Sequence, residues 1–356
     1  MNSVATVGNA TMICYEGSKP ILSTDPWFGE KDSAYFGSWI GSHTIPKNYQ
    51  DDILKSEFIW LSHGHPDHLN PQSIKNFLHK KILISDHYGS RIFDDLTKEN
   101  YNLTIIPDKK WIELSKNISI LSITTPNQDS ILLVKVNNTL FVNLNDADTI
   151  YCNKYIRKIA KSFKNSFLLA LASYGDADMI NFYDEKGNFV VPPAKNNQDV
   201  GGHLSMLAKS LSLKGVIPFS SHHQYQRSDS IWAQEFTTPT HAYEKGLDTR
   251  LLYIKPFSVV ECDHNNKSYP IDVEKINVKI KKPEDFGDNY SDILEKKDLD
   301  KIRKYFYKKK DLFKFLKFIN FRVGNKDNFI DFYKDTNKGI TFSLPKNSLM
   351  SAIQYE

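Results

Sequence analysis

Apolar residues in the first part of the chain fall into short runs bounded by turn signals, a pattern that is typical of β-strands. The runs 11–15 and 20–24 flank Glu-Gly-Ser-Lys, and the runs 131–136 and 139–144 flank Asn-Asn. Both arrangements predict hairpins. Further short apolar runs predict strands at 58–61, 82–84, 118–123, 167–171 and 216–219.

Three other segments have the apolar spacing of amphipathic helices. One is predicted over 70–79, because Asn70-Pro71 has the form of an N-cap followed by proline at the first helical position. The other two are predicted over 150–163 and 204–213. Since strands and helices intermix without strict alternation, the sequence predicts an α/β protein in which helices cover sheets in layers.

The composition changes near residue 265, and from Lys275 onward the chain is rich in lysine and aromatic residues. We therefore predict a larger domain over 1–264 and a small α+β, mainly helical extension over 265–356. Its spacing predicts a helix over 312–319 and strand-forming sequence at 339–342 and 349–353. Lysine runs of this kind are usually a solvated helix face, and a membrane-surface or nucleic-acid-binding helix is the alternative.

Charge and cysteine content narrow the class of protein. The 356 residues include 46 basic and 42 acidic ones, a net charge of +4, which predicts no general attraction to nucleic acid or to an anionic membrane. The three cysteines, Cys14, Cys152 and Cys262, are too far apart in sequence to suggest a disulfide framework or a metal knuckle. We expect no leader and no membrane-spanning segment, and hence a cytoplasmic protein.

The most specific signal is a cluster of four potential metal ligands directly after the strand predicted at 58–61. His63, His65, Asp67 and His68 lie within six residues and offer imidazole and carboxylate donors, which suit zinc, iron or manganese. A polar loop of hydrogen-bonded histidines would not need three of them so close together. A metal-bound water at such a site is a nucleophile at neutral pH, and Asp67 would either ligate the metal or accept the proton of that water.

This H-x-H-x-D-H element resembles the signature of the metallo-β-lactamase fold superfamily. The resemblance covers roughly residues 1–262. The resemblance implies that residues 1–264 form a four-layer αββα sandwich that binds metal. The C-terminal extension would be an addition to this domain. Within the superfamily, Thr24-Asp25-Pro26-Trp27, residues 61–69 and residues 143–146 look most like the metallo-β-lactamase-like region of the CMP-N-acetylneuraminate hydroxylase branch.

The resemblance also implies a ligand set. His63 and His65 would bind one metal, and Asp67 and His68 a second. Asp146 stands where the superfamily has its bridging aspartate, and the closing histidine would be His222 or His223. We expect one or two divalent ions, with zinc preferred and iron or manganese as alternatives.

Two departures from the superfamily pattern affect this expectation. Residues 124–129 read Thr-Thr-Pro-Asn-Gln-Asp, without the histidine of the third motif, so one metal is either absent or completed by Asn127 or Asp129. The sialic-acid hydroxylase also carries a Rieske cluster, which the three scattered cysteines of this chain cannot build.

Weaker candidates surround these motifs. Asp25 either orients a ligand histidine or initiates a turn at Asp-Pro. Tyr225 and Arg227 are candidates to bind an anionic substrate, with a surface loop as the alternative. His203 follows two glycines at a helix start that either binds an anion or is only a turn.

Three functions follow from these observations. The first choice is a metal-dependent hydrolase that acts on a phosphodiester, amide, ester or lactone, with a small-molecule substrate and no nucleic acid. The second is a dinuclear-iron oxygenase that receives electrons from a separate protein. The third is a metal-binding protein without catalytic activity.

Overall fold

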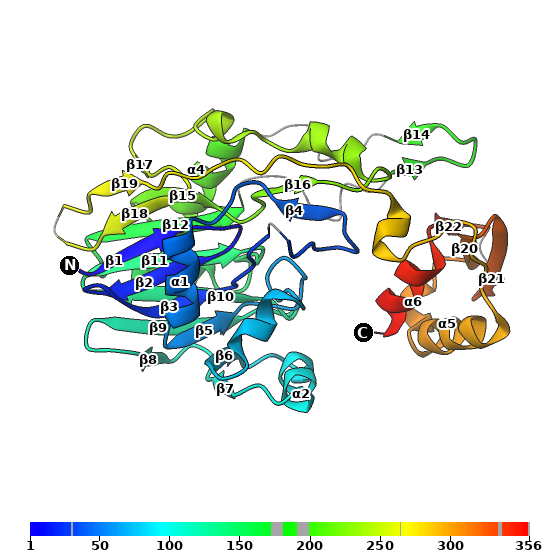
Figure 1. Ribbon diagram of the computed structural model, residues 1–356, viewed down its shortest axis with the longest axis horizontal. Helices are drawn as coiled ribbons and strands as arrows, with labels where there is room; N and C mark the ends of the chain where they lie inside the picture. Colours follow the sequence, from blue (N-terminus) through cyan, green and yellow to red (C-terminus); the bar gives the residue numbers. More distant parts are fainter. Residues whose placement is uncertain (30, 172–180, 191–198, 264, 334–336, 355–356) are drawn as a thin grey trace. The chain divides into compact units, whose positions relative to one another are not determined.

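The computed structural model describes residues 1–29, 31–171, 181–190, 199–263, 265–333 and 337–354. The chain divides into two compact units (Figure 1). The larger unit comprises Met1–Gln226 and Ser230–Val278, and the smaller one comprises Arg227–Asp229 and Lys279–Glu356. The larger unit thus extends past residue 265, because the strand Ser268–Pro270 pairs with Ser258–Glu261 and adds to its first sheet.

Two sheets form the centre of the larger unit. In the described residues, the first sheet has eight strands in the order β19 (Ser268–Pro270), β18 (Ser258–Glu261), β1 (Ser3–Thr6), β2 (Met12–Glu16), β3 (Lys19–Thr24), β5 (Phe58–Leu61), β6 (Lys81–Ser85) and β7 (Leu103–Ile106). The second has seven, in the order β17 (Leu252–Tyr253), β15 (Gly215–Phe219), β12 (Asn165–Leu171), β11 (Thr139–Asn145), β10 (Ser130–Val136), β9 (Ile118–Thr124) and β8 (Trp111–Glu113).

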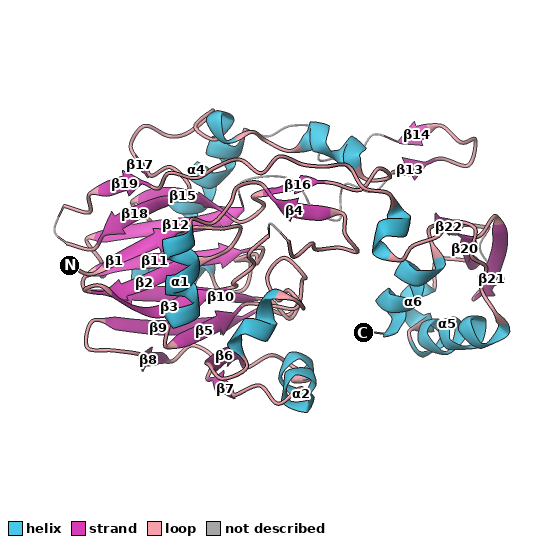
Figure 2. Ribbon diagram, in the orientation of Figure 1, coloured by secondary structure: helices cyan, strands magenta, loops and turns pink. Residues whose placement is uncertain are grey.

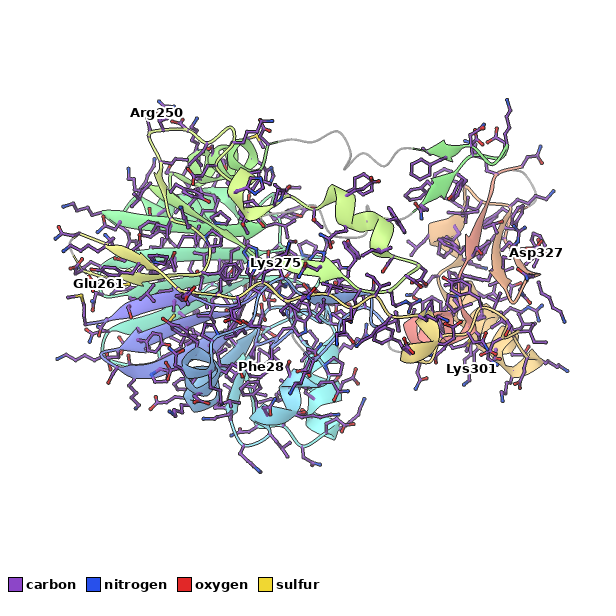
Figure 3. All side chains as sticks on the ribbon, turned by 45° about the horizontal axis from the view of Figure 1, so that its top comes forward. Phe28, Arg250, Glu261, Lys275, Lys301 and Asp327 are labelled. Carbon is purple, nitrogen blue, oxygen red and sulfur yellow. The ribbon has the colours of Figure 1, made fainter. Side chains whose placement is uncertain are left out.

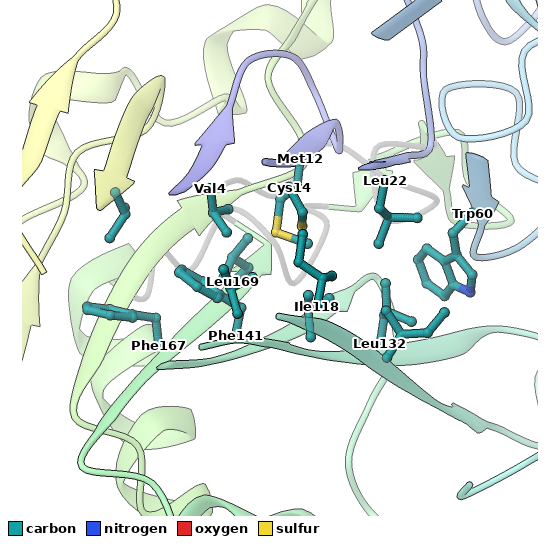
Figure 4. Close-up of a cluster of buried hydrophobic side chains, with 14 of the residues drawn as sticks. Val4, Met12, Cys14, Leu22, Trp60, Ile118, Leu132, Phe141, Phe167 and Leu169 are labelled. Atoms are coloured by element: carbon teal, nitrogen blue, oxygen red, sulfur yellow. The ribbon is translucent and has the colours of Figure 1, made fainter. Parts of the chain in front are cut away.

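The two sheets face each other across an apolar core. Figure 4 shows Met12, Leu22 and Trp60 of the first sheet opposite Leu132 and Phe141 of the second, all fully or almost fully buried. Successive side chains of a strand point to opposite faces of its sheet. The continuous apolar runs in the sequence are therefore explained by burial on both faces of the strands.

Helices cover the outer face of each sheet (Figure 2). On the first sheet, Ile53 of α1 (Lys47–Lys55) and Leu96 of α2 (Arg91–Lys98) belong to one buried cluster with Ile59 of β5. On the second sheet, Ile156 of α3 (Asn153–Ala160) and Leu204 of α4 (Val200–Leu211) form another. The predicted α/β class is confirmed, and helices lie outside both of the packed sheets.

The segment predicted as a helix over 70–79 is different. It forms a short 3₁₀ helix, Ser73–Phe77, flanked by turns. The Asn70 side chain caps it as expected and accepts hydrogen bonds from the backbone N–H groups of Gln72 and Ser73, at 2.9 and 3.1 Å. Asn76 donates its side-chain N–H to the Ser73 carbonyl, a local bond that competes with the α-helical pattern.

The smaller unit is α+β. Its main elements are α5 (Lys296–Lys308), β20 (Phe318–Val323), β21 (Lys326–Asp331), β22 (Gly339–Ser343) and α6 (Lys346–Gln354). The helix predicted over 312–319 is wrong, because Ile319 lies in β20 between two partner strands. The strand predicted at 349–353 is also wrong: Leu349 and Ile353, one helical turn apart in α6, both pack on the core of this unit.

Several short elements complete the description: β4 (Trp39–Gly41), β16 (His223–Tyr225), β13 (Phe182–Tyr183), β14 (Phe189–Val190), and the 3₁₀ helices Ile231–Phe236, Thr240–Ala242, Pro283–Phe286 and Lys310–Phe313. Among the residues that the structure describes, no helix is both long enough and apolar enough to cross a membrane.

Candidate metal centre

The site is built where parallel strands of both sheets end. In the first sheet, β3 and β5 are parallel, and they are followed by Asp25 and by the segment 62–68. In the second, β11 and β15 are both parallel to β12, and they lead to Asp146 and to residues 220–223. The carboxyl ends of parallel strands share one edge of a sheet, which is where α/β proteins place their sites.

In both His63 and His68, a carboxylate contacts the Nδ1 atom of the ring. His68 is fully buried, and its Nδ1 lies 3.0 Å from Asp25 Oδ2. His63 Nδ1 lies 3.3 Å from Asp129 Oδ1 and 2.9 Å from Ser62 Oγ. In both rings, Nε2 is buried and has no hydrogen-bond partner among the described residues. A carboxylate on one nitrogen and an unsatisfied second nitrogen is the arrangement that metal-ligating histidines have.

Asp146 faces these two nitrogens. One nitrogen of His63, one of His68 and one carboxylate oxygen of Asp146 all lie within 4.8 Å of one another. Asp146 Oδ2 is also 3.7 Å from Nδ1 of His65, whose side chain is 59% exposed. Buried polar atoms without partners are costly, and here they surround one small volume. The donor set therefore fits a divalent metal ion.

The buried Asp67 carboxylate is at the edge of this group. Its Oδ2 lies 3.4 Å from His68 Nε2 and accepts a hydrogen bond of 2.9 Å from Asn9 Nδ2. Its Oδ1 accepts a hydrogen bond of 3.0 Å from the Tyr35 hydroxyl. Asp67 is thus held by one donor that precedes β2 and by another that follows β3.

Asp25 lies at the centre of a hydrogen-bond network under the site. It is fully buried and accepts from the Ser62 backbone N–H at 2.8 Å, from Ser62 Oγ at 2.7 Å and from Asn145 Nδ2 at 3.0 Å, in addition to its contact with His68. The turn-former alternative therefore does not account for Asp25, whose side chain contacts strand ends of both sheets.

His222 and His223 are neighbours in sequence with different surroundings. His222 Nδ1 lies 3.3 Å from the Tyr243 hydroxyl, and its ring packs on Phe257. His223 stacks on Trp39 with ring centroids 3.5 Å apart, and neither of its ring nitrogens has a partner among the described residues. Nε2 of His222 is also buried without a partner among the described residues, and burial lowers the pKa of both rings. Both histidines therefore remain candidate ligands.

The charged groups of this cluster shift one another's pKa values. Burial opposes a charge on His68, but the Asp67 and Asp146 carboxylates raise its pKa well above the ordinary value. Burial also opposes the charge of Asp146, yet His68 and His65 hold its pKa well below the ordinary value. Burial and the nearby Asp146 raise the pKa of Asp129 to about 7. Such shifts are typical of functional sites.

The remaining candidates have other surroundings. Arg227 is buried and paired with Asp229 and Asp288, its Nη1 lying 2.6 Å from Asp288 Oδ2. The two carboxylates compensate the buried charge of Arg227, so no bound substrate is needed to explain its burial. Tyr225 is buried, and its ring lies edge-on to His223 at 5.2 Å.

His203 is half-buried in α4, in the helical layer over the second sheet. Of the two glycines before it, Gly201 is explained by packing. A Cβ at Gly201 would lie 2.6 Å from the Lys245 carbonyl oxygen and 2.8 Å from that of Tyr243. Close approach of two backbone segments is a common reason for glycine. The contacts at this helix start therefore favour the turn over the anion site.

Some residues of the site gave no signal in the sequence. Asn9 connects two ligand loops, because its side chain donates to Asp67 and accepts from the His222 backbone N–H at 2.6 Å. Tyr35 and Asn145 are equally unmarked. Asn127, one of the two residues expected to replace the missing histidine, is exposed, whereas Asp129 contacts His63.

Known proteins resemble this chain over part of its length. No family model matches the chain. Over 131 residues it is 24% identical to the cytidine monophosphate-N-acetylneuraminic acid hydroxylase of Danio rerio, a match that covers 34% of this chain and 22% of that protein. Over 159 residues it is 28% identical to a putative Rieske 2Fe-2S iron-sulfur protein of Mycolicibacterium smegmatis, covering 40% of this chain and 29% of the relative. The matches thus span less than a third of the length of these relatives.

Two solved structures have similar architecture. The isothiocyanate hydrolase from Delia radicum gut bacteria has a TM-score of 0.47 and 13% identity, covering 73% of this chain and 98% of that one. The diiron β-hydroxylase CmlA from Streptomyces venezuelae has a TM-score of 0.41 and 11% identity, covering 62% and 45%.

Two packed sheets with helices outside them are the layers expected for a resemblance to the metallo-β-lactamase fold, and the cluster of His63, His68 and Asp146 lies at the ends of their strands. Its relatives in sequence include CMP-N-acetylneuraminic acid hydroxylases. The resemblance to that superfamily and to that branch is confirmed.

Proposed function

We propose that the chain is a metal-dependent hydrolase. The observation that carries the proposal is the convergence of the unpartnered Nε2 atoms of His63 and His68 on the carboxylate of Asp146, at the ends of strands from both sheets. Imidazole and carboxylate donors of this kind suit zinc first, and iron or manganese next.

We assign the ligand roles as follows. His63, His65 and Asp146 would hold one ion, and Asp67, His68 and His223 would contribute to a second, with Asp146 between them. His222, whose Nε2 is also buried without a partner among the described residues, is the alternative to His223. Asp25 and Asp129 would orient His68 and His63 through their Nδ1 atoms.

A bound divalent ion would supply a water of lowered pKa and polarise the carbonyl or phosphoryl oxygen of a phosphodiester, amide, ester or lactone. Asp67 is the candidate base, although hydrogen bonds from Asn9 and Tyr35 to its two oxygens favour a ligand role. The half-buried Tyr35 and buried Trp39 would form an aromatic wall for an organic substrate.

The test is hydrolysis of a panel of nitrophenyl esters, nitrophenyl phosphodiesters and lactones by the zinc-loaded protein. His68→Ala should abolish any activity found with the wild type. His203→Ala is the matched control, because it removes a histidine from α4, and it should keep full activity. Hydrolysis that survives His68→Ala unchanged, or that falls equally in both variants, would rule out this site as its source.

An iron-dependent oxygenase is the second candidate, favoured by the hydroxylases among the sequence relatives. It would require a separate electron donor. Loading with Fe(II) without oxygen, followed by addition of O2, distinguishes the two. An oxygen-dependent absorption band from about two irons per chain would favour the oxygenase. Stoichiometric zinc without such a band would favour the hydrolase, and the absence of bound metal would favour a role without catalysis.

The proposed compartment is the cytoplasm. All three cysteines are free and buried. Reduced thiols are the usual state of cysteines in that compartment.

A further inference from the structure

The lysine-rich part of the smaller unit has a larger net positive charge than the whole protein. Residues 296–317 include ten basic and three acidic residues, a net charge of +7, whereas the whole chain carries +4. The charge is therefore concentrated on α5 and the 3₁₀ helix Lys310–Phe313 that follows it. Concentrated charge of one sign attracts partners of the opposite sign even when the net charge of the chain is small.

The carboxylates of this unit do not neutralise the lysines of α5 that face outward. Asp298 pairs with Lys346 at 2.9 Å, and Asp300 lies 3.8 Å from Arg303. Among the described residues, Lys301, Lys304 and Lys308 have no ion pair with a carboxylate. They follow one another at intervals of three and four residues and so lie on one face of the helix.

These three lysines line a cleft between α5 and α6. Its other walls include Tyr305, Met350 and Ile353, and its volume is about 420 Å³. Figure 3 labels Lys301 on this helix. The cleft combines ammonium groups with aliphatic and aromatic walls, so it fits an anionic group attached to an apolar body.

Two large apolar side chains are exposed directly after α5. Leu312 is 74% exposed and Phe315 is 70% exposed, whereas the intervening Phe313 and the following Leu316 pack on the core of the unit. The two exposed side chains are thus not needed to close that core. Lysines at 308, 309, 310, 314 and 317 flank them.

We propose that the lysine-rich segment 296–317 of the smaller unit docks on the surface of a bilayer that contains anionic phospholipids. The lysines of α5 would contact lipid phosphates, and Leu312 and Phe315 would enter the boundary between head groups and acyl chains. Apolar side chains beside clustered lysines are the combination that interfacial membrane segments have. A nucleic acid would attract the lysines equally, but it offers no apolar phase for an exposed leucine.

The experiment is co-sedimentation of the full chain with vesicles of phosphatidylcholine alone, and with vesicles in which about one third is phosphatidylglycerol. Binding is expected only to the anionic vesicles, and it should weaken as salt is raised. Because each lysine near an anionic surface contributes about fivefold in binding, Lys304→Glu with Lys308→Glu should reduce binding by at least about 25-fold. Leu312→Ser with Phe315→Ser should reduce it by about tenfold or more.

The control makes the same charge change elsewhere. Lys154→Glu with Lys158→Glu alters two exposed lysines of α3, and it should leave vesicle binding nearly unchanged. Far-ultraviolet circular dichroism verifies that each variant folds. Equal loss in the α3 variant, equal binding to both vesicle types, or unchanged binding after the serine substitutions would overturn the proposal. Binding of single-stranded RNA that is tighter than vesicle binding and insensitive to the serine substitutions would assign the surface to nucleic acid instead.

Discussion

Replacing Asp25 by asparagine should weaken metal binding although no atom facing the metal changes. Three polar atoms lie within hydrogen-bond distance of Oδ2 of Asp25: Ser62 Oγ at 2.7 Å, His68 Nδ1 at 3.0 Å and Asn145 Nδ2 at 3.0 Å. In Asp25→Asn, an amide N–H₂ placed there would face these donors instead of accepting from them. If the amide is reversed, the Ser62 backbone N–H loses its acceptor. Neither orientation preserves the network.

The magnitude follows from the role of this carboxylate. A partner that fixes the ring and tautomer of a ligand histidine typically contributes 10- to 100-fold in metal affinity, about 1.4 to 2.7 kcal/mol. The variant should therefore bind zinc about 10- to 100-fold more weakly. In addition, a buried donor left without an acceptor costs about 1 to 3 kcal/mol, so the free energy of unfolding of the metal-free protein should fall by about that amount.

Zinc affinity is measured by competition with a chromogenic chelator, and unfolding by urea titration of the metal-free protein. The matched control is Asp272→Asn, which makes the same change at an exposed residue and should alter neither quantity. Wild-type zinc affinity in a folded Asp25→Asn protein would refute the assignment of Asp25 as the residue that orients His68.

Three further predictions test the rest of the account. Arg227→Met should lower stability by about 3 to 5 kcal/mol, since it removes the arginine from the buried Asp288 carboxylate, and should leave zinc content unchanged; loss of activity with full stability would instead support substrate binding. Gly201→Ala should cost about 1 to 3 kcal/mol in a thermal or urea titration because its Cβ meets the Lys245 carbonyl; unchanged stability would contradict the packing explanation. Burial lowers the pKa of His222 and of His223 to about 3. The contribution of these neutral histidines to the free energy of unfolding is therefore fully present above pH 6.5 and is lost as the pH falls towards 3. Urea titrations of the metal-free protein should show a loss of about 1.4 kcal/mol per histidine for each pH unit below 6.5, and constant stability would contradict the buried neutral state.

The short-range parts of the fold could be predicted from the sequence. The two hairpins could be predicted because each turn lies between two apolar runs that are adjacent in the chain, as in β10 and β11. The segments 312–319 and 349–353 are assigned incorrectly because partners elsewhere decide their conformation, whereas in 70–79 a local side-chain bond competes with the α-helix. Ile319 shows this clearly, since two other strands hold it in a sheet despite its helical spacing.

The same distinction applies to the site. His63, His65, Asp67 and His68 could be recognised because their spacing is local. Asn9 could not be recognised, because it reaches Asp67 across 58 positions of the chain through folding alone.

Asp25 and Asp129 lie between these cases. Asp25 is a candidate because it follows a predicted strand, and Asp129 because it lies in the motif that lacks its histidine. Only the contacts with His68 and His63 assign each to one histidine.

The central claim is that the strand ends of the two sheets hold a divalent metal ion. The most direct measurement is metal content per chain by mass spectrometry, on protein prepared with and without oxygen, for the wild type and for His63→Ala. The account predicts one or two ions per chain in the wild type and a clear loss in a variant that still folds. No metal in either wild-type preparation, or the same metal content in the variant, would contradict it.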